Sequence, residues 1–195
     1  MREDSGMVTI QKYQKYIYVI FCALLVVFGI VTNIKYGFAL YKTASYAALS
    51  IGCLTIARID YTEHRIPNRI LWILLLVRSF FLLVEIIWRG IAGSEGWRFT
   101  NLFRSCVGLL VGLAIMLLVY VVSRHAIGMG DVKLSAVIGF FMGMTGWYIA
   151  MIFGSILAAG FSIVQLIRKK MKLKDEIPLG PFLAAGVVIA VIIGA

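Results

Sequence analysis

Two aspartates stand where long apolar runs end or begin, and carboxyl groups at such positions could do chemistry. Asp60 lies in the segment RIDYTEHRIPN (58–68), after one apolar run, and Asp131 lies in HAIGMGDVKL (125–134), before another. Two carboxyls held close together cannot both ionise cheaply, so one keeps its proton while the other stays charged. Such a pair supplies a base that activates water and an acid that protonates the carbonyl oxygen of a scissile amide. A single aspartate at the end of a span is commonly a helix cap or a charge at the water boundary. The two aspartates together predict a site of peptide hydrolysis.

The residues around the aspartates set the shape of the backbone. Pro67 disfavours helical geometry at the residue before it, and Pro67 or Asn68 can start the next helix. Gly128 and Gly130 allow backbone shapes that other residues resist, and they let another backbone approach closely. An extended substrate peptide could then pair with this glycine-rich segment by strand-like hydrogen bonds. The candidates for substrate contact or for shaping the loop are Gly128, Gly130, Pro67, Asn68 and Lys133.

Long apolar runs must position these residues. Of the 195 residues, 62% are hydrophobic and only 14% are charged, whereas soluble domains are about half apolar and a quarter charged. The composition predicts an all-α polytopic bundle in a lipid bilayer, with about six or seven membrane segments in a single domain over 1–195. The predicted segments are 16–32, 38–57, 69–89, 104–123, 132–143, 145–167 and 178–195.

Two of these segments have distinct interpretations. The segment 132–143 is too short to cross a bilayer alone. It ends in the turn-like cluster Gly143-Met144-Thr145-Gly146, which predicts a partial helix that enters the membrane and turns back into 145–167. The first apolar run, 16–32, has no clear small-residue cleavage site, so we interpret it as a retained span rather than a signal peptide.

Basic residues predict the orientation. The formal net charge is +10, but Lys and Arg gather in short loops between apolar runs, which argues against nucleic-acid binding. The run RKKMKLKDE (168–176) predicts a cytoplasmic loop. Counting spans back from it puts both aspartates and the N-terminus on the cytoplasmic side of the inner or plasma membrane. Three arginines on the predicted outer side run against this rule, and the inner excess is larger; they are Arg89, Arg98 and Arg104.

Three motifs resemble those of the type IV prepilin peptidase family, which are aspartic membrane proteases with a G-x-G-D signature. The motifs are DYTEHRIPN (60–68), GMGDVKL (128–134) and IPLGPFLAAG (177–186). The resemblance implies cleavage of leader peptides from type IV pilin-like precursors at the cytoplasmic face, with Asp60 and Asp131 as the catalytic pair. It implies that no metal and no organic cofactor take part in proteolysis.

The peptidase motifs extend over 58–186. Family members with a longer N-terminal region carry a cysteine-paired zinc loop and also methylate the new N-terminus. The cysteines of this sequence, Cys22, Cys53 and Cys106, each lie inside an apolar run and form no C-x-x-C pair. The sequence therefore resembles a short form, for which the resemblance does not imply methyl transfer.

Other residues leave alternatives open. His64 and His125 lie near the two aspartates in sequence and could complete a metal site, although histidines at a membrane interface are more often structural. Arg78 and Glu85 lie within a predicted span, where ionisable residues are either functional or paired with another helix. They motivate a second hypothesis, a proton- or cation-coupled transporter. A third hypothesis is a non-catalytic scaffold of a pilus or secretion assembly.

Overall fold

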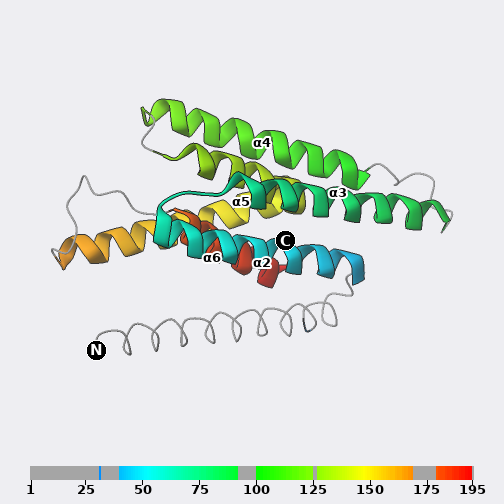
Figure 1. Cartoon of the computed structure of the whole chain (residues 1–195), viewed down its shortest axis with the longest axis horizontal. Coiled ribbons are helices and arrows are strands. Elements are labelled where there is room, and N and C mark those ends of the chain that lie inside the picture. Colours follow the sequence, from blue (N-terminus) through cyan, green and yellow to red (C-terminus); the bar gives the residue numbers. More distant parts are fainter. Residues whose placement is uncertain (1–30, 32–39, 92–99, 125–126, 169–178, 195) are drawn as a thin grey trace, which may run out of the picture.

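The computed structural model describes residues 31, 40–91, 100–124, 127–168 and 179–194. Every regular element in these ranges is an α-helix, which confirms the predicted all-α fold (Figure 1). Apart from residue 31, the predicted span 16–32 lies outside the described residues, as does the N-terminus that is predicted to be cytoplasmic. The helices are α2 (Leu40–Glu63), α3 (Asn68–Ile91), α4 (Thr100–Val122), α5 (Met129–Ile167) and α6 (Gly180–Ile193).

Several of the described helices have the length and composition of membrane spans. Three stretches among the described residues are long and apolar enough to cross a bilayer, namely Asn68–Trp88, Thr100–Val122 and Met129–Ile167, and α6 is a shorter apolar helix. Large apolar side chains, including those of Leu76, Phe80 and Leu118, are exposed on the outside of the bundle. Lipid tails suit such a surface because they are as apolar as the side chains themselves. The protein is therefore a multi-pass membrane protein; a count of about six or seven segments stays a prediction.

The long helix α5 consists of two helices joined at Gly143. The backbone there has φ 72° and ψ −174°, a combination that is open almost only to glycine. The indole nitrogen of Trp147 donates a hydrogen bond to Oγ of Ser135 at 2.7 Å, and the same hydroxyl lies 3.9 Å from Sδ of Met151. Because Gly143 is midway between Ser135 and Met151, the second half must fold back along the first (Figure 1). The predicted short helix that turns back at this cluster is confirmed.

A buried arginine, Arg78, donates a hydrogen bond to a carbonyl group in the last turn of the first half of α5. The last four carbonyl groups of a helix have no partner within it, and there is no water in the bilayer core to bind them. Phe140 lies in the last turn before Gly143, and its carbonyl oxygen accepts a hydrogen bond from Nε of Arg78 at 3.3 Å. Nη2 of Arg78 also donates to Oγ of Ser105 at 2.9 Å. This arginine of α3 thus joins α4 and α5, which explains a charge inside an apolar helix.

Glu85, which also lies on α3, forms hydrogen bonds with neighbouring helices as Arg78 does. It is buried, and its Oε1 accepts hydrogen bonds from the hydroxyl of Tyr41 at 3.3 Å and from Nδ2 of Asn101. It therefore links α3 to α2 and α4. Arg78 and Glu85 both bind neighbouring helices, as one of the two readings of their sequence context predicts. Both residues that motivate the transporter hypothesis thus have hydrogen-bond partners on neighbouring helices.

We expect the Arg78→Leu variant to be less stable than the native protein by about 2 kcal/mol, because the buried carbonyl of Phe140 and the hydroxyl of Ser105 lose their donor. Arg78→Lys should retain part of this stability, since lysine keeps a charge and a donor. The measurement is thermal unfolding in detergent. The control is Arg69→Leu, which removes an exposed arginine from the first turn of the same helix. Equal effects at the two positions would contradict this role for Arg78.

The packing of the bundle brings four helix ends together. α2 ends, and α3, α5 and α6 begin, at the same end of the molecule, on the left in Figure 1. α5 contacts α4 and α6 most extensively, and α2 packs against α6. The core between them holds aliphatic and aromatic side chains; those buried most completely include Leu49, Ile56, Ile138, Phe141, Leu183 and Val187. Both aspartates lie at this common end.

Candidate active site

Asp60 lies inside α2, one turn before that helix ends at Glu63. Its side chain is buried, with 7% of its surface exposed. The predicted apolar segment ended at residue 57, but the helix continues to Glu63. The extension has a simple cause, because the polar residues after 57 lie mostly at an exposed end of the helix and need no apolar surroundings. Asp60 is therefore held by a regular helix rather than by a loop.

The start of α6 binds the carboxyl of Asp60. The backbone N–H of Gly180 donates a hydrogen bond to Oδ2 of Asp60 at 2.9 Å. A Cβ at position 180 would lie 2.7 Å from this oxygen, so only glycine fits there without displacing the carboxyl. The N-terminus of a helix also carries partial positive charge, which favours an ionised carboxyl. Sequence reasoning gave Gly180 no role of its own, although it recognised the motif 177–186.

Asp131 lies in the first turn of α5 and is also buried, with 9% of its surface exposed. Its backbone N–H donates to the carbonyl oxygen of Gly128 at 3.0 Å, which fixes the start of the helix. Its Oδ1 is buried and has no hydrogen-bond partner among the described residues. A buried polar atom without a partner is costly, and such atoms concentrate at functional sites. The carboxyls of Asp60 and Asp131 are therefore held in different ways.

The fold brings the two carboxyls into electrostatic contact. The negative charge of Asp60 acts on the carboxyl of Asp131 although the two residues are far apart in sequence. Both belong to helices that touch each other, and both are buried at the same end of the bundle. Two interacting carboxyls in a buried site share charge unequally, so one is suited to hold a proton while the other is ionised.

The sequence predicts that the two glycines of GMGD allow unusual backbone conformations, but the structure shows other features at these positions. Gly128 caps α5 with φ −67° and ψ 140°, an extended conformation that any residue can adopt. A Cβ at Gly130 would lie 2.8 Å from Cβ of Ile66, in the connection between α2 and α3. Close approach, not an unusual backbone angle, therefore explains glycine at position 130. The segment that approaches Gly130 is the side chain of Ile66 in the same chain, and close approach of a substrate backbone stays a prediction.

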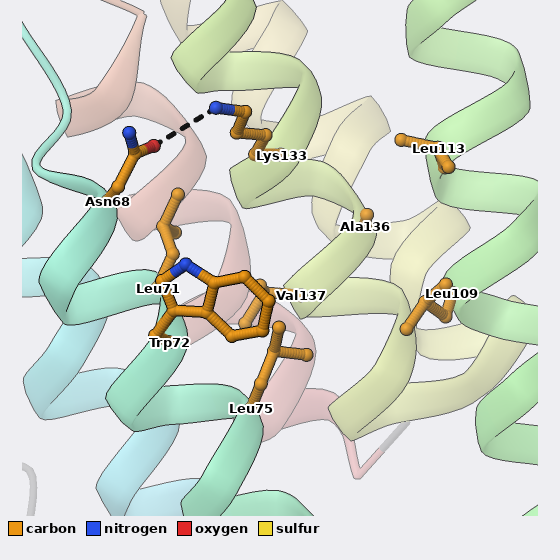
Figure 2. A pocket seen from close by; sticks show the side chains of 9 residues that line it. All are labelled: Asn68, Leu71, Trp72, Leu75, Leu109, Leu113, Lys133, Ala136 and Val137. Atoms are coloured by element: carbon orange, nitrogen blue, oxygen red, sulfur yellow. Dashed lines mark hydrogen bonds between the residues drawn. The ribbon is translucent and has the colours of Figure 1, made fainter.

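Asn68 and Lys133 join the two motifs directly. α3 begins at Asn68, immediately after Pro67, as the sequence predicts. Nζ of Lys133 donates a hydrogen bond to Oδ1 of Asn68 at 3.1 Å (Figure 2). With the contact between Gly130 and Ile66, this bond fixes the start of α5 against the connection that follows Asp60. These residues position the segment that carries Asp131.

The histidines form no metal site within the described residues. His64 follows the end of α2 with φ 49°, and its backbone N–H donates to the carbonyl oxygen of Asp60 at 2.9 Å. Its side chain is exposed. The part of the chain that the structure describes contains no group of three or more His, Cys, Asp and Glu side chains placed to hold a metal ion. His125 lies outside that part.

Comparison with known proteins decides the family. The type IV leader peptidase family matches residues 47–163, which is more than half of the chain and includes both aspartates. The chain belongs to this family. The third motif, 177–186, lies beyond the matched residues, although its Gly180 binds Asp60 in the structure.

Curated relatives of this leader peptidase family member are named prepilin leader peptidase/N-methyltransferase. The protein from Bacillus subtilis is 26% identical over 83% of this chain and 60% of its own length. The protein from Stutzerimonas stutzeri is 26% identical over 76% of this chain and 49% of its own length. The protein from Burkholderia pseudomallei is 28% identical over 54% of this chain and 36% of its own length. The chain thus spans between about a third and three fifths of these relatives. No solved structure matches it.

Proposed function

We propose that this chain is a membrane-embedded aspartic endopeptidase that cleaves leader peptides from type IV pilin-like precursors. The observation that supports this activity most directly is the pair of buried, interacting carboxyls of Asp60 and Asp131 at one end of the bundle. The family and the names of the relatives supply the substrate class. Hydrolysis by two carboxyls requires only water, so we propose no metal and no organic cofactor.

The surroundings of the two carboxyls suggest which is the base and which is the acid. Asp60 accepts a hydrogen bond from the start of α6, an environment that stabilises the ionised form. Oδ1 of Asp131 is buried without a partner and lies near a negative charge, an environment that favours a protonated carboxyl. We therefore assign Asp60 as the general base and Asp131 as the general acid.

The reaction then proceeds in two steps. Asp60 takes a proton from water while the water oxygen attacks the scissile carbonyl carbon, and Asp131 gives its proton to the carbonyl oxygen. The resulting tetrahedral intermediate collapses when Asp60 passes its proton to the leaving nitrogen, which breaks the C–N bond. Asp131 recovers a proton from the hydroxyl of the intermediate. Each carboxyl ends in its starting state.

The proposed site faces the cytoplasm. Three arginines near the aspartate end are exposed, and basic residues beside membrane spans favour the cytoplasmic side. These residues are Arg58, Arg65 and Arg69. The substrate would be an extended peptide that reaches the carboxyls from this side, close to the start of α5. The whole of 1–195 would form one membrane domain around the site.

The test of the proposed function is cleavage of a leader-bearing pilin-like precursor by the purified full chain in detergent. Mass spectrometry of the products should show a single cut between leader and mature protein. The same chain with both Asp60→Asn and Asp131→Asn should leave the precursor intact. A chain that folds and binds the precursor without cutting it would instead support the non-catalytic scaffold.

We expect Gly180→Ala to reduce the rate of cleavage by roughly 10- to 100-fold, because the added methyl group must displace the carboxyl of Asp60 and small displacements of catalytic groups are costly. The measurement is the initial rate at saturating precursor, together with the thermal midpoint of unfolding. Gly90→Ala is the matched control, since a Cβ there meets nothing within 4 Å. A native rate in Gly180→Ala would show that the contact does not position Asp60.

A further inference from the structure

A groove separate from the two aspartate side chains runs along the outside of the bundle. It lies between α3, α4 and the first half of α5, and its volume is about 320 Å³ (Figure 2). Its walls are almost entirely apolar. They are formed by Leu71, Trp72, Leu75, Leu109, Leu113, Ala136 and Val137. An apolar groove on a membrane protein attracts a hydrocarbon chain rather than water.

One end of the groove is cationic. Figure 2 shows Lys133 and Asn68 joined by their hydrogen bond where the groove begins. An ammonium group has three donors, and this bond uses one. Lys133 forms no ion pair with any described residue. The groove therefore offers a positive charge at one end and hydrocarbon contact below it.

We propose that this groove binds one acyl chain of an anionic phospholipid, with the phosphate of the headgroup at Nζ of Lys133. Basic pockets between membrane helices on the cytoplasmic side are suited to such headgroups. The volume is at the lower end of the range for small-molecule pockets, which suits a single hydrocarbon chain. A peptide helix, about 10 Å in diameter with its side chains, fits poorly in the same space. The proposal rests on the membrane location and not on peptidase activity.

The position of the groove connects the lipid to the candidate active site. Lys133 is in the same helical turn as Asp131, and Asn68 directly follows Pro67 in the connection after α2. A phosphate at Lys133 would therefore bind next to the hydrogen bond between Lys133 and Asn68, which joins the two motifs. The phosphate would hold the ammonium group of Lys133 in place through a charge-assisted hydrogen bond, while another of its N–H groups donates to Asn68.

The experiment uses Trp72, which lines the groove, as a reporter. The full chain is reconstituted with phosphatidylcholine that contains an equal mole fraction of brominated phosphatidylglycerol or brominated phosphatidylcholine, since bromine quenches nearby tryptophan. The signal of Trp72 is obtained by subtracting that of Trp72→Phe. We expect phosphatidylglycerol to bind about fivefold more tightly than phosphatidylcholine, the advantage that one lysine near the surface provides.

Three variants separate the groove from the surrounding lipid. Lys133→Gln should lose the preference for phosphatidylglycerol, and Lys133→Arg should keep it. Ala136→Phe fills the groove and should reduce quenching of Trp72 by both lipids, whereas Ala114→Phe, on an exposed part of α4, should not. If Ala136→Phe does not fold, the comparison of Lys133→Gln with Lys133→Arg still decides the question.

Two results would overturn the proposal. Equal quenching by the two brominated lipids in the native chain would mean that Trp72 reports only bulk lipid. Displacement of the brominated lipid by a leader-bearing precursor would mean that the groove is occupied by the substrate. Neither readout requires cleavage, so a chain without peptidase activity could still support the lipid site.

Discussion

Asp131→Asn should reduce leader cleavage by about 10³-fold or more. Asparagine has nearly the same shape as aspartate, so the fold should persist, but its amide cannot donate a proton as an acid. General acid–base catalysis typically contributes about 10² to 10⁴ to the rate. Asp60→Asn should have an effect of the same order, because an amide cannot take a proton from water. The measurement is the initial rate of cleavage of a purified precursor, compared with the native chain at equal protein concentration.

The matched control for these variants is Glu63→Gln. It changes an exposed carboxyl to an amide at the last residue of α2, one turn after Asp60, and should leave the rate unchanged. The variant with both aspartates replaced should be hardly slower than either single variant, because groups that act as a unit have non-additive effects. A native rate in Asp60→Asn or Asp131→Asn would exclude the two-carboxyl mechanism.

Gly139→Ala should destabilise the fold by about 2 kcal/mol or more. α4 and α5 lie close together at Gly108 and Gly139, where a Cβ on residue 139 would lie 2.1 Å from the backbone oxygen of Gly108. A flexible side chain could move aside, but a helix backbone can give way only if the two helices separate. Thermal unfolding in detergent should show a lower midpoint than for the native chain.

Gly160→Ala is the control for the close approach. It lies on the second half of the same helix, and a Cβ there meets nothing within 4 Å. It should leave the unfolding midpoint unchanged or raise it slightly, because alanine favours helix over glycine. If Gly139→Ala were as stable as Gly160→Ala, the packing of α4 against α5 would have to be looser than the contact between Gly108 and Gly139 indicates.

The parts of the fold that the sequence predicts are those that depend on local pattern. Apolar runs predict the helices because a helix that crosses the bilayer needs about 20 consecutive residues that are mostly apolar. The cluster around Gly143 predicts a reversal, since glycines permit the backbone angles that a turn within the membrane needs. Hydropathy predicts an apolar segment that ends at residue 57, whereas α2 continues to Glu63. The difference arises because a helix can continue after its apolar residues stop.

The parts of the site that the sequence does not predict depend on contacts between distant segments. Nothing near Gly180 indicates that its N–H binds Asp60, which is far earlier in the chain. The hydrogen bond of Lys133 to Asn68 is likewise a product of how α3 and α5 pack. The sequence does predict Asp60 and Asp131 as a pair, because each lies at an end of an apolar run and both ends are predicted on the same side of the membrane. Their partners became visible only in three dimensions.

The early end of the first half of α5 has a consequence for the bilayer itself. A helix that runs from Met129 to Met142 rises only about 20 Å, whereas the hydrocarbon layer is about 30 Å thick. The reversal at Gly143 is buried, so this helix cannot be lengthened to match. Almost every side chain in this half of α5 is buried, so the helix ends against protein and not against lipid. The neighbouring helices α3 and α4, with 24 and 23 residues, are long enough to cross the hydrocarbon layer beside it. The bilayer can therefore keep its thickness around a helix too short to cross it.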